Sequence, residues 1–258
     1  MTYETIRLEE KHNGQVLEIF LNVPPANILS EKMIREIEQQ IVEETKNQNR
    51  KLIVFSGTGA HFSYGASVEE HLPGKVESML PTFHRLMVKI VECPVPTLAK
   101  VTGLCLGGAF ELALCCSFIF ADERAKFGVP EIQLGVFPPI AAAILPALCS
   151  STLLNEMILT GDRFEARYLC DRGVINRACE TQRLDTEVAT FTEKHILPKS
   201  ASSLRIAHQA ARMSVVNGFK EKVQALEDLY LGKLMRTADA QEGLKAFVEK
   251  RQAKWQNV

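Results

Sequence analysis

The sequence has no excess of either charge. Its 258 residues include 30 Lys and Arg against 31 Asp and Glu, which gives a formal net charge of −1 at pH 7. Nucleic acids and anionic membrane surfaces attract proteins through basic residues, and no basic excess or polybasic run occurs here. We therefore expect no nucleic-acid partner and no electrostatic membrane binding. A local basic patch for a phosphorylated ligand remains compatible with this charge, because net charge averages over the whole chain.

Long hydrophobic runs are also missing. The longest apolar stretch, around residues 138–148, is too short to span a bilayer and contains prolines. The first residues include no apolar segment of the kind that secretory signals carry. We therefore expect no membrane partner and a cytoplasmic location. The chain is 46% hydrophobic and 24% charged, as is usual for a globular protein of a size that can bury a core.

Recognisable metal, redox and nucleotide motifs are absent. The seven cysteines form no CxxC pair and the six histidines form no HExxH pattern, so we expect reduced cysteines and no metal. Gly57-Thr58-Gly59 follows an apolar run, but Phe62 stands where a dinucleotide-binding loop has its third glycine. Ser63 lacks the preceding glycine of a nucleophile elbow. His61 and His71 flank a possible ligand loop, and we expect structural or surface roles for both.

Strand and helix patterns alternate in the first half of the chain. Residues 16–21, 52–55, 97–101 and 117–121 predict strands, the last of these being the final long one. Ser30 is a plausible helix N-cap before an apolar stripe that ends at Ile41, and a second helix is expected from about Pro81. Beyond about Pro138 nearly everything indicates helix. An interrupted amphipathic stripe runs there from Phe219 through Tyr230 to Leu234.

This order indicates the α/β class, with repeated ββα units followed by helices. We expect one core domain over residues 1–195 and a helical C-terminal region over residues 196–258. Neither a fixed-period repeat nor a flexible linker separates them.

The most informative segment is residues 103–113, Gly-Leu-Cys-Leu-Gly-Gly-Ala-Phe-Glu-Leu-Ala. A strand leads into glycines, which let a backbone pass close to a ligand, and a helix then begins. Amides at a helix start have no partners within the helix and can bind an oxyanion. Glu111 lies in the first helical turn, in an almost wholly apolar segment. A buried carboxylate is unfavourable unless it is paired or used in chemistry, so Glu111 is either a capping or ion-paired residue or a catalytic one.

A second carboxylate stands in a similar setting. Glu131 follows Pro130 directly in residues 125–135, Ala-Lys-Phe-Gly-Val-Pro-Glu-Ile-Gln-Leu-Gly. Alone this would be a weak signal. Together with Glu111 it predicts paired carboxylates near free backbone amides, an arrangement suited to proton transfer beside a developing enolate.

These motifs resemble those of the crotonase, or enoyl-CoA hydratase/isomerase, superfamily. The resemblance rests on Gly107-Gly108-x-x-Glu111-Leu and on Phe127-Gly128-x-Pro130-Glu131-Ile-x-Leu-Gly135, and it extends over nearly the whole chain. It also includes residues 62–66 and the Asp-Ala-x-Glu-Gly pattern that starts at Asp239. Both catalytic carboxylates of the hydratases are present at their usual separation.

The resemblance implies a crotonase-like spiral of ββα units, with C-terminal helices that form trimers and contribute to the coenzyme A site. A homohexamer, built as a dimer of trimers, is therefore expected. The substrate would be an acyl-CoA thioester, with no metal or redox cofactor, because coenzyme A is part of the substrate. Its thioester oxygen would lie between the amides of Ala66 and Gly108, while Glu111 and Glu131 add water. Implied substrate-binding residues are Tyr64, Ser67, Val68, Gly107, Pro139 and Lys250.

Two departures from the usual family pattern bear on the substrate. Ser67 replaces a typical aspartate, and Pro138-Pro139 begin a turn that is usually rich in glycine. Residues 61–71, 134–137 and 198–205 resemble a subgroup of the family, the cyclohexa-1,5-diene-1-carbonyl-CoA hydratases of anaerobic benzoyl-CoA degradation. The expected reaction is 1,4-addition of water to give 6-hydroxycyclohex-1-ene-1-carbonyl-CoA. Linear enoyl-CoA hydration, another isomerase or hydrolase reaction of this superfamily, and a non-catalytic RNA-binding scaffold stay open as alternatives.

Overall fold

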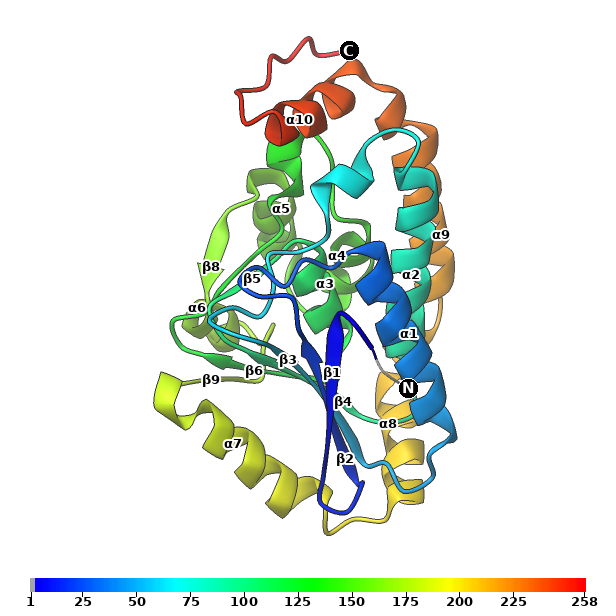
Figure 1. Cartoon of the computed structure of the whole chain (residues 1–258), viewed down its shortest axis with the longest axis vertical. Helices are drawn as coiled ribbons and strands as arrows, with labels where there is room; N and C mark the ends of the chain where they lie inside the picture. The colour runs from blue at the N-terminus through cyan, green and yellow to red at the C-terminus, as the bar shows by residue number, and fades with distance from the viewer. Residues whose placement is uncertain (1–2) are drawn as a thin grey trace.

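The computed structural model describes residues 3–258 and is built around a six-stranded mixed sheet (Figure 1). β1 and β2 pair antiparallel, and the other neighbours pair parallel, in the order β1-β2-β3-β4-β6-β9. The strands are β1 (Ile6–Lys11), β2 (Val16–Leu21), β3 (Leu52–Gly57), β4 (Thr97–Val101), β6 (Phe118–Asp122) and β9 (Arg177–Cys179). The four strands predicted from the sequence are thus confirmed as β2, β3, β4 and β6.

A second sheet of three short strands lies at the carboxyl end of the first. β5 (Leu104–Leu106) pairs parallel with β7 (Lys126–Gly128), which pairs antiparallel with β8 (Arg163–Glu165). The two informative segments of the sequence therefore run side by side, because Leu106 pairs with Gly128 directly before each glutamate-bearing turn. The expectation of almost pure helix beyond Pro138 was wrong for β8 and β9. Each has only three residues, too few to show an alternating pattern.

The helices α1 (Glu31–Lys46) and α2 (Val76–Glu92) pack on one face of the large sheet. Ser30 caps α1 as predicted, since its side chain accepts a hydrogen bond from the Met33 amide. The prediction that the second helix starts near Pro81 was wrong, because Pro81 lies inside α2. Burial of Val76, Met79 and Leu80 extends the helix on the N-terminal side, at about 1.5–3 kcal/mol for each apolar side chain, which offsets the cost of an internal proline of about 3 kcal/mol.

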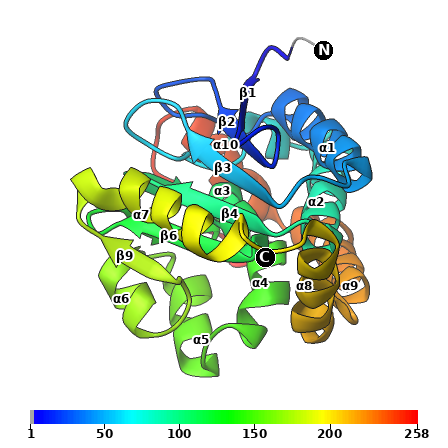
Figure 2. The same cartoon turned by 90° about the horizontal axis from the view of Figure 1, so that it is seen from below.

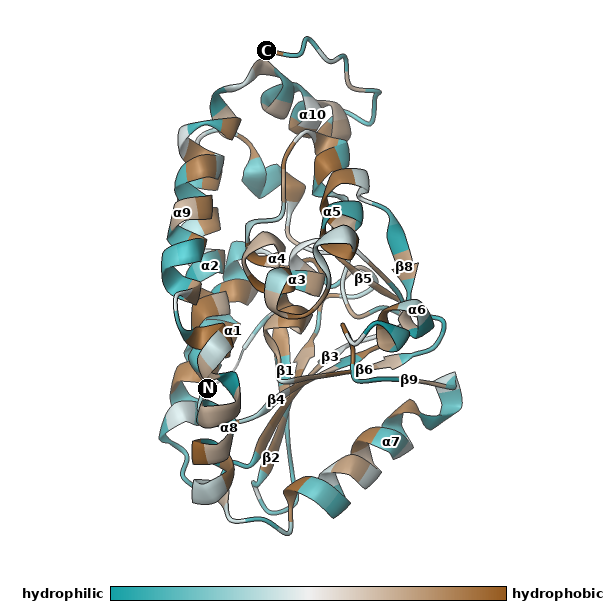
Figure 3. Ribbon diagram, turned by 180° about the vertical axis from the view of Figure 1, so that it is seen from behind, coloured by the Kyte–Doolittle hydropathy of each residue, from teal (hydrophilic) through white to brown (hydrophobic). Residues whose placement is uncertain are grey.

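The remaining helices surround this core. They are α3 (Gly108–Cys115), α4 (Pro139–Ile144), α5 (Ser151–Thr160), α6 (Ala166–Asp171), α7 (Leu184–Phe191), α8 (Ala201–Val216), α9 (Phe219–Gly232) and α10 (Ala238–Val248). α7 covers the opposite face of the sheet, where Leu184 joins a small apolar cluster with Val54 and Phe120 (Figure 2). Brown apolar positions accordingly concentrate on the strands in Figure 3. Within residues 3–258, no helix has both the length and the apolar character needed to cross a bilayer.

α9 carries the predicted amphipathic stripe and ends at Gly232, the residue expected to interrupt it. Phe219, Val223 and Tyr230 are buried. α9 runs along α2, and a hydrogen bond of 2.6 Å between His84 Nδ1 and Glu227 Oε2 joins the two helices (Figure 1). α9 also packs against α4, which in turn contacts α3, the helix that carries Glu111.

Candidate active site

The loop after β3 is held against the start of α3 by a glycine with an unusual backbone. Gly65 has φ +106°, and a Cβ there would lie 2.6 Å from the Leu106 carbonyl oxygen, so only glycine fits without a shift. The Leu29 amide donates to the Gly65 oxygen at 2.9 Å and fixes the loop from the other side. As a result Ala66 lies next to Gly108, since a Cβ built on Gly108 would be 3.4 Å from the Ala66 nitrogen.

Two backbone amides, of Ala66 and Gly108, are therefore brought together at one cavity. Gly108 is the first residue of α3, whose amide has no acceptor within the helix. No backbone hydrogen bond from the Ala66 amide is found in the described part of the chain. The resemblance to the crotonase superfamily implies that these two amides hold a thioester oxygen. Their role as the oxyanion site stays a prediction.

Glu111 lies in the first turn of α3 and is only 3% exposed. Its Oε1 accepts a hydrogen bond of 2.8 Å from the Ala141 amide, and the Ile140 amide also stabilises the carboxylate. Both amides belong to the start of α4, where Pro139 occupies the first helical position, which needs no backbone donor. Burial raises the pKa of Glu111 to about 7, and the two amides limit that rise.

Glu131 lies in a 3₁₀ turn over Pro130–Leu134 and has a different environment. Its Oε1 packs against Gly107, where a Cβ would approach to 2.8 Å, and Gly107 has φ +52°. Its Oε2 is buried and has no hydrogen-bond partner. The pKa of Glu131 is raised well above its usual value, first by burial and then by the charge of Glu111. The protonated form is therefore favoured at Glu131.

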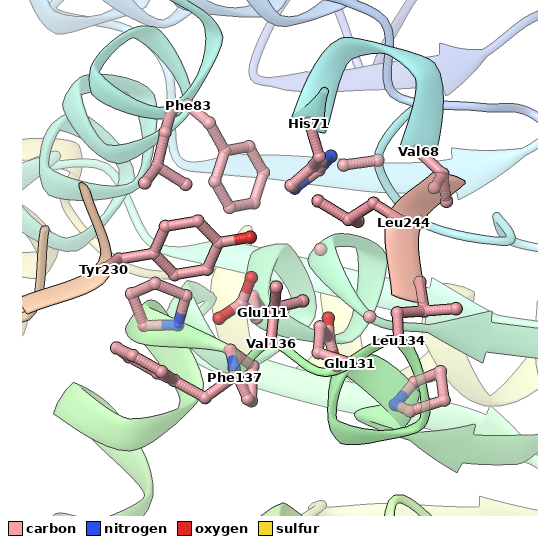
Figure 4. A pocket seen from close by; sticks show the side chains of 18 of the residues that line it. Val68, His71, Phe83, Glu111, Glu131, Leu134, Val136, Phe137, Tyr230 and Leu244 are labelled. Carbon is pink, nitrogen blue, oxygen red and sulfur yellow. The ribbon is translucent and has the colours of Figure 1, made fainter. Parts of the chain in front are cut away.

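Both glutamates face an inner cavity of about 80 Å³ (Figure 4). That volume is enough for a few water molecules or for a small part of a ligand. Phe83, Phe137 and Tyr230 form aromatic walls, and Leu244 and Val136 add apolar surface. A cavity with few polar groups, two of them carboxyls with raised pKa values, is the usual form of a catalytic site.

An outer cavity of about 640 Å³ shares Tyr64, Val68 and Leu134 with the inner one. The two cavities therefore meet at this boundary. Among the predicted substrate-binding residues, Tyr64, Val68, Gly107 and Pro139 line the inner cavity, and Ser67 lines the outer one.

Lys250 is the predicted binding residue that the fold does not bring to the site. It lies in the turn after α10 with φ +54°, is exposed, and lines neither cavity. The positive φ turns the chain at this point, and Arg251 lines the outer cavity instead, while its side chain is paired with Glu242 and Glu249. Arg163 of β8 is a second arginine at this cavity, which the sequence argument missed.

Two residues of the inner cavity were also missed as site residues. His71 Nδ1 donates to the Ser67 carbonyl oxygen at 2.7 Å, and burial lowers the pKa of His71, so the ring is neutral with Nε2 as an acceptor. The expected structural or surface role is thus incomplete, because His71 lines the cavity. Tyr230 was assigned only to the apolar stripe of a helix. The sequence signal for it was its polar hydroxyl on an otherwise apolar face.

Other residues that the sequence set aside have structural roles. His61 Nδ1 accepts a hydrogen bond of 3.1 Å from the Leu104 amide, which fixes the loop beside β5. All seven cysteines are free, and burial raises the pKa of Cys93 to about 11 and of Cys116 to about 12, so these thiols are unreactive. Among residues 3–258 no group of three or more His, Cys, Asp or Glu side chains is arranged to hold a metal ion.

Comparison with known proteins shows the family. Residues 11–258 match the family model described as "Enoyl-CoA hydratase/isomerase". The cyclohexa-1,5-dienecarbonyl-CoA hydratase of Thauera aromatica is 39% identical over 249 residues, with 96% of this chain and 95% of that protein covered. The crotonyl-CoA hydratase of Syntrophomonas wolfei subsp. wolfei is 29% identical, with 98% of each covered.

A solved structure shows the same fold. The crystal structure of an enoyl-CoA hydratase/isomerase from Xanthobacter autotrophicus Py2 superposes with a TM-score of 0.85 at 27% identity, covering 97% of this chain and 98% of that one. The chain therefore belongs to the enoyl-CoA hydratase/isomerase family of the crotonase superfamily and is a hydro-lyase of the enoyl-CoA hydratase type.

Proposed function

We propose that this hydratase adds water to cyclohexa-1,5-diene-1-carbonyl-CoA and forms 6-hydroxycyclohex-1-ene-1-carbonyl-CoA, as in the anaerobic degradation of benzoyl-CoA. The observation that carries the proposal is the similarity to the Thauera aromatica enzyme. Identity to that protein is 39%, against 29% to the Syntrophomonas crotonyl-CoA hydratase, although both alignments cover nearly the whole chain. A closer match over similar coverage supports a shared substrate in addition to the shared fold.

The walls of the inner cavity support a ring substrate. Phe83, Phe137 and Tyr230 surround the carboxyl of Glu111 (Figure 4). The rings of Phe137 and Tyr230 pack edge to face, with 5.4 Å between their centroids. Aromatic walls of this kind favour a flat, unsaturated ring through dispersion and edge contacts. Pro139 in place of a glycine stiffens the turn beside Glu111, which limits how far this wall of the cavity can move.

Addition of water then proceeds in two coupled proton transfers. Glu111 removes a proton from the water, whose oxygen bonds to the ring carbon β to the thioester carbonyl. Electrons move onto the thioester oxygen and spread over the second double bond as a dienolate. Glu131 then gives its proton to the far carbon of that double bond, which leaves the remaining double bond beside the thioester. One water is consumed, and the proton gained by Glu111 balances the proton lost by Glu131.

The two environments support this assignment of base and acid. The amides of Ile140 and Ala141 stabilise the charged form of Glu111, whereas Glu131 has no such donors at Oε2 and favours its neutral form. A base with a pKa near 7 and a neighbouring protonated acid are suited to operate near neutral pH. Each such group contributes about 10²- to 10⁴-fold to the rate.

The amides of Ala66 and Gly108 would hold the thioester oxygen and stabilise the dienolate. Loss of one such donor typically costs roughly 10²- to 10³-fold in rate. The coenzyme A part would lie in the outer cavity, beside Ser67 and within reach of Arg163 and Arg251. Arg163 and Arg251 are the cationic residues that line this cavity in the described chain, and Arg251 is also paired with Glu242 and Glu249. The dimer of trimers stays a prediction, as does a contribution of Lys250 to binding.

A direct assay tests the proposal. The purified protein is given cyclohexa-1,5-diene-1-carbonyl-CoA and crotonyl-CoA side by side, and the initial rates give kcat/KM for each. We expect the ring substrate to be favoured at least tenfold and its product to carry deuterium at the protonated ring carbon when D₂O is the solvent. Faster turnover of crotonyl-CoA would overturn the ring assignment in favour of linear hydration.

A further inference from the structure

The hydroxyl of Tyr230 is a buried polar group with no partner. The side chain is 1% exposed, and its oxygen makes no hydrogen bond within the described chain. A buried hydroxyl without a partner costs roughly 1–3 kcal/mol, so a fold retains one where a ligand or water completes it. The carboxyl oxygen Oε2 of Glu131 is a second such atom, and both residues line the inner cavity.

Neighbouring residues hold the Tyr230 side chain in place. Tyr230 belongs to α9, and Glu227 one turn earlier is hydrogen-bonded to His84 of α2. The ring packs edge-on against Phe137 and belongs to an apolar cluster with Val76 and Leu80. Figure 4 shows the hydroxyl directed into the cavity toward the carboxyl of Glu111. The ring is therefore fixed by packing, while its polar end remains available to a ligand.

One hydrogen-bonding position on the reacting water has no partner among the two glutamates. The water gives one proton to Glu111 and uses one lone pair to attack the substrate carbon. Its second lone pair can accept one hydrogen bond. Glu131 cannot supply it without diverting the proton that it delivers to carbon. Glu111 is an acceptor, and its Oε1 is already occupied by the Ala141 amide.

We infer that the Tyr230 hydroxyl donates a hydrogen bond to the oxygen that is added to the substrate. In the hydration direction this oxygen is the attacking water, and in the dehydration direction it is the hydroxyl that leaves. Tyr230 donates a hydrogen bond and transfers no proton. Burial and the two nearby carboxyls raise the pKa of Tyr230, which keeps the hydroxyl protonated throughout. The inference rests on the proposed hydration but applies to any acyl-CoA that the enzyme hydrates.

The variant Tyr230→Phe removes only the hydroxyl and keeps the ring. We expect kcat/KM for hydration to fall about 10- to 100-fold, the effect of one hydrogen bond made in a buried site. The KM for the hydroxyacyl-CoA in the dehydration direction should rise more than the KM for the unsaturated substrate, because only the former carries the oxygen. Thermal stability should be unchanged or higher, since the variant removes an unpartnered buried group.

Tyr168→Phe is the matched control. Tyr168 is partly buried against Phe164 and Arg172, outside both cavities, so its variant should keep the wild-type rate. The inference is overturned if Tyr230→Phe has wild-type kinetics, or if it lowers stability and weakens both substrates alike, as a purely structural hydroxyl would. If the wild-type enzyme prefers crotonyl-CoA, the ring assignment fails, but the same comparison on crotonyl-CoA and its hydroxy product still decides the role of Tyr230.

Discussion

The two glutamate-bearing segments use the same side chain in opposite surroundings. Glu111 lies in the first turn of α3 and meets the first amides of α4, so its carboxylate has donors even though it is buried. Glu131 lies in a 3₁₀ turn, packs against Gly107 and has one oxygen without any partner. Desolvation raises the pKa of both, but Glu111 is compensated by two α4 amides, whereas Glu131 has only its own backbone amide and also faces the charge of Glu111. The comparison shows how two identical groups come to favour different protonation states through unequal backbone donors and the charge that one places on the other.

Replacement of either carboxyl tests the comparison most strongly. Glu131→Gln removes the proposed acid, and Glu111→Gln removes the proposed base. We expect each to lower kcat by about 10²- to 10⁴-fold. The variants should then differ in partial reactions. On the hydroxy product, Glu111→Gln should lose dehydration but keep solvent-proton exchange at the carbon that Glu131 protonates, whereas Glu131→Gln should lose both. Wild-type turnover by Glu131→Gln would exclude the two-carboxyl mechanism.

The stability of Glu111→Gln tests the desolvation argument. The pKa of Glu111 rises from 4.5 to about 7 on folding, so the folded state binds the proton more tightly than the unfolded state. Stability therefore falls as pH rises through this window, and the variant should escape that loss. At pH 8 it should exceed the wild type by up to about 3 kcal/mol, and near pH 4 the two should be similar.

Urea unfolding at both pH values measures this difference. Glu156→Gln, on an exposed position of α5, is the control and should follow the wild type at both. Equal stability of Glu111→Gln and the wild type at pH 8 would mean that the α4 amides fully compensate the buried charge.

Gly107→Ala tests how closely the chain at position 107 packs against the Glu131 carboxyl. We expect a smaller loss of activity than for the two glutamate variants. A Cβ at this position would be 2.8 Å from Glu131 Oε1, so the carboxyl must move by a few tenths of an ångström. We expect a loss of about tenfold in kcat, since larger misplacements of about 1 Å cost roughly a hundredfold. Gly173→Ala has a similar positive φ but open space around it, so it should lose stability and keep full activity. Equal activities of the two variants would show that glycine at position 107 is needed only for its backbone conformation and not for the space that it leaves to Glu131.

The chemistry of this protein was visible in the sequence because it depends on local patterns. The glycines before Glu111, the proline before Glu131 and the apolar residues around both predicted buried carboxyls beside free amides. The strands β2, β3, β4 and β6 were predictable for the same reason, since each has enough residues to show its pattern. The start of α2 and the strands β8 and β9 were not, because burial of Val76 and pairing with distant strands decided them.

The sequence by itself thus determined the two glutamates of residues 103–113 and 125–135. It also determined the glycines beside them, whose backbone angles other residues rarely adopt. Tertiary structure decided which partners each carboxyl has. The amides of Ile140 and Ala141 meet Glu111 across about thirty residues of chain, and Tyr230 reaches the cavity from a helix more than ninety residues beyond Glu131. Such contacts leave no periodic signal along the chain, because they depend on how separate elements pack. That packing supports the proposed roles of Glu111 as base and Glu131 as acid.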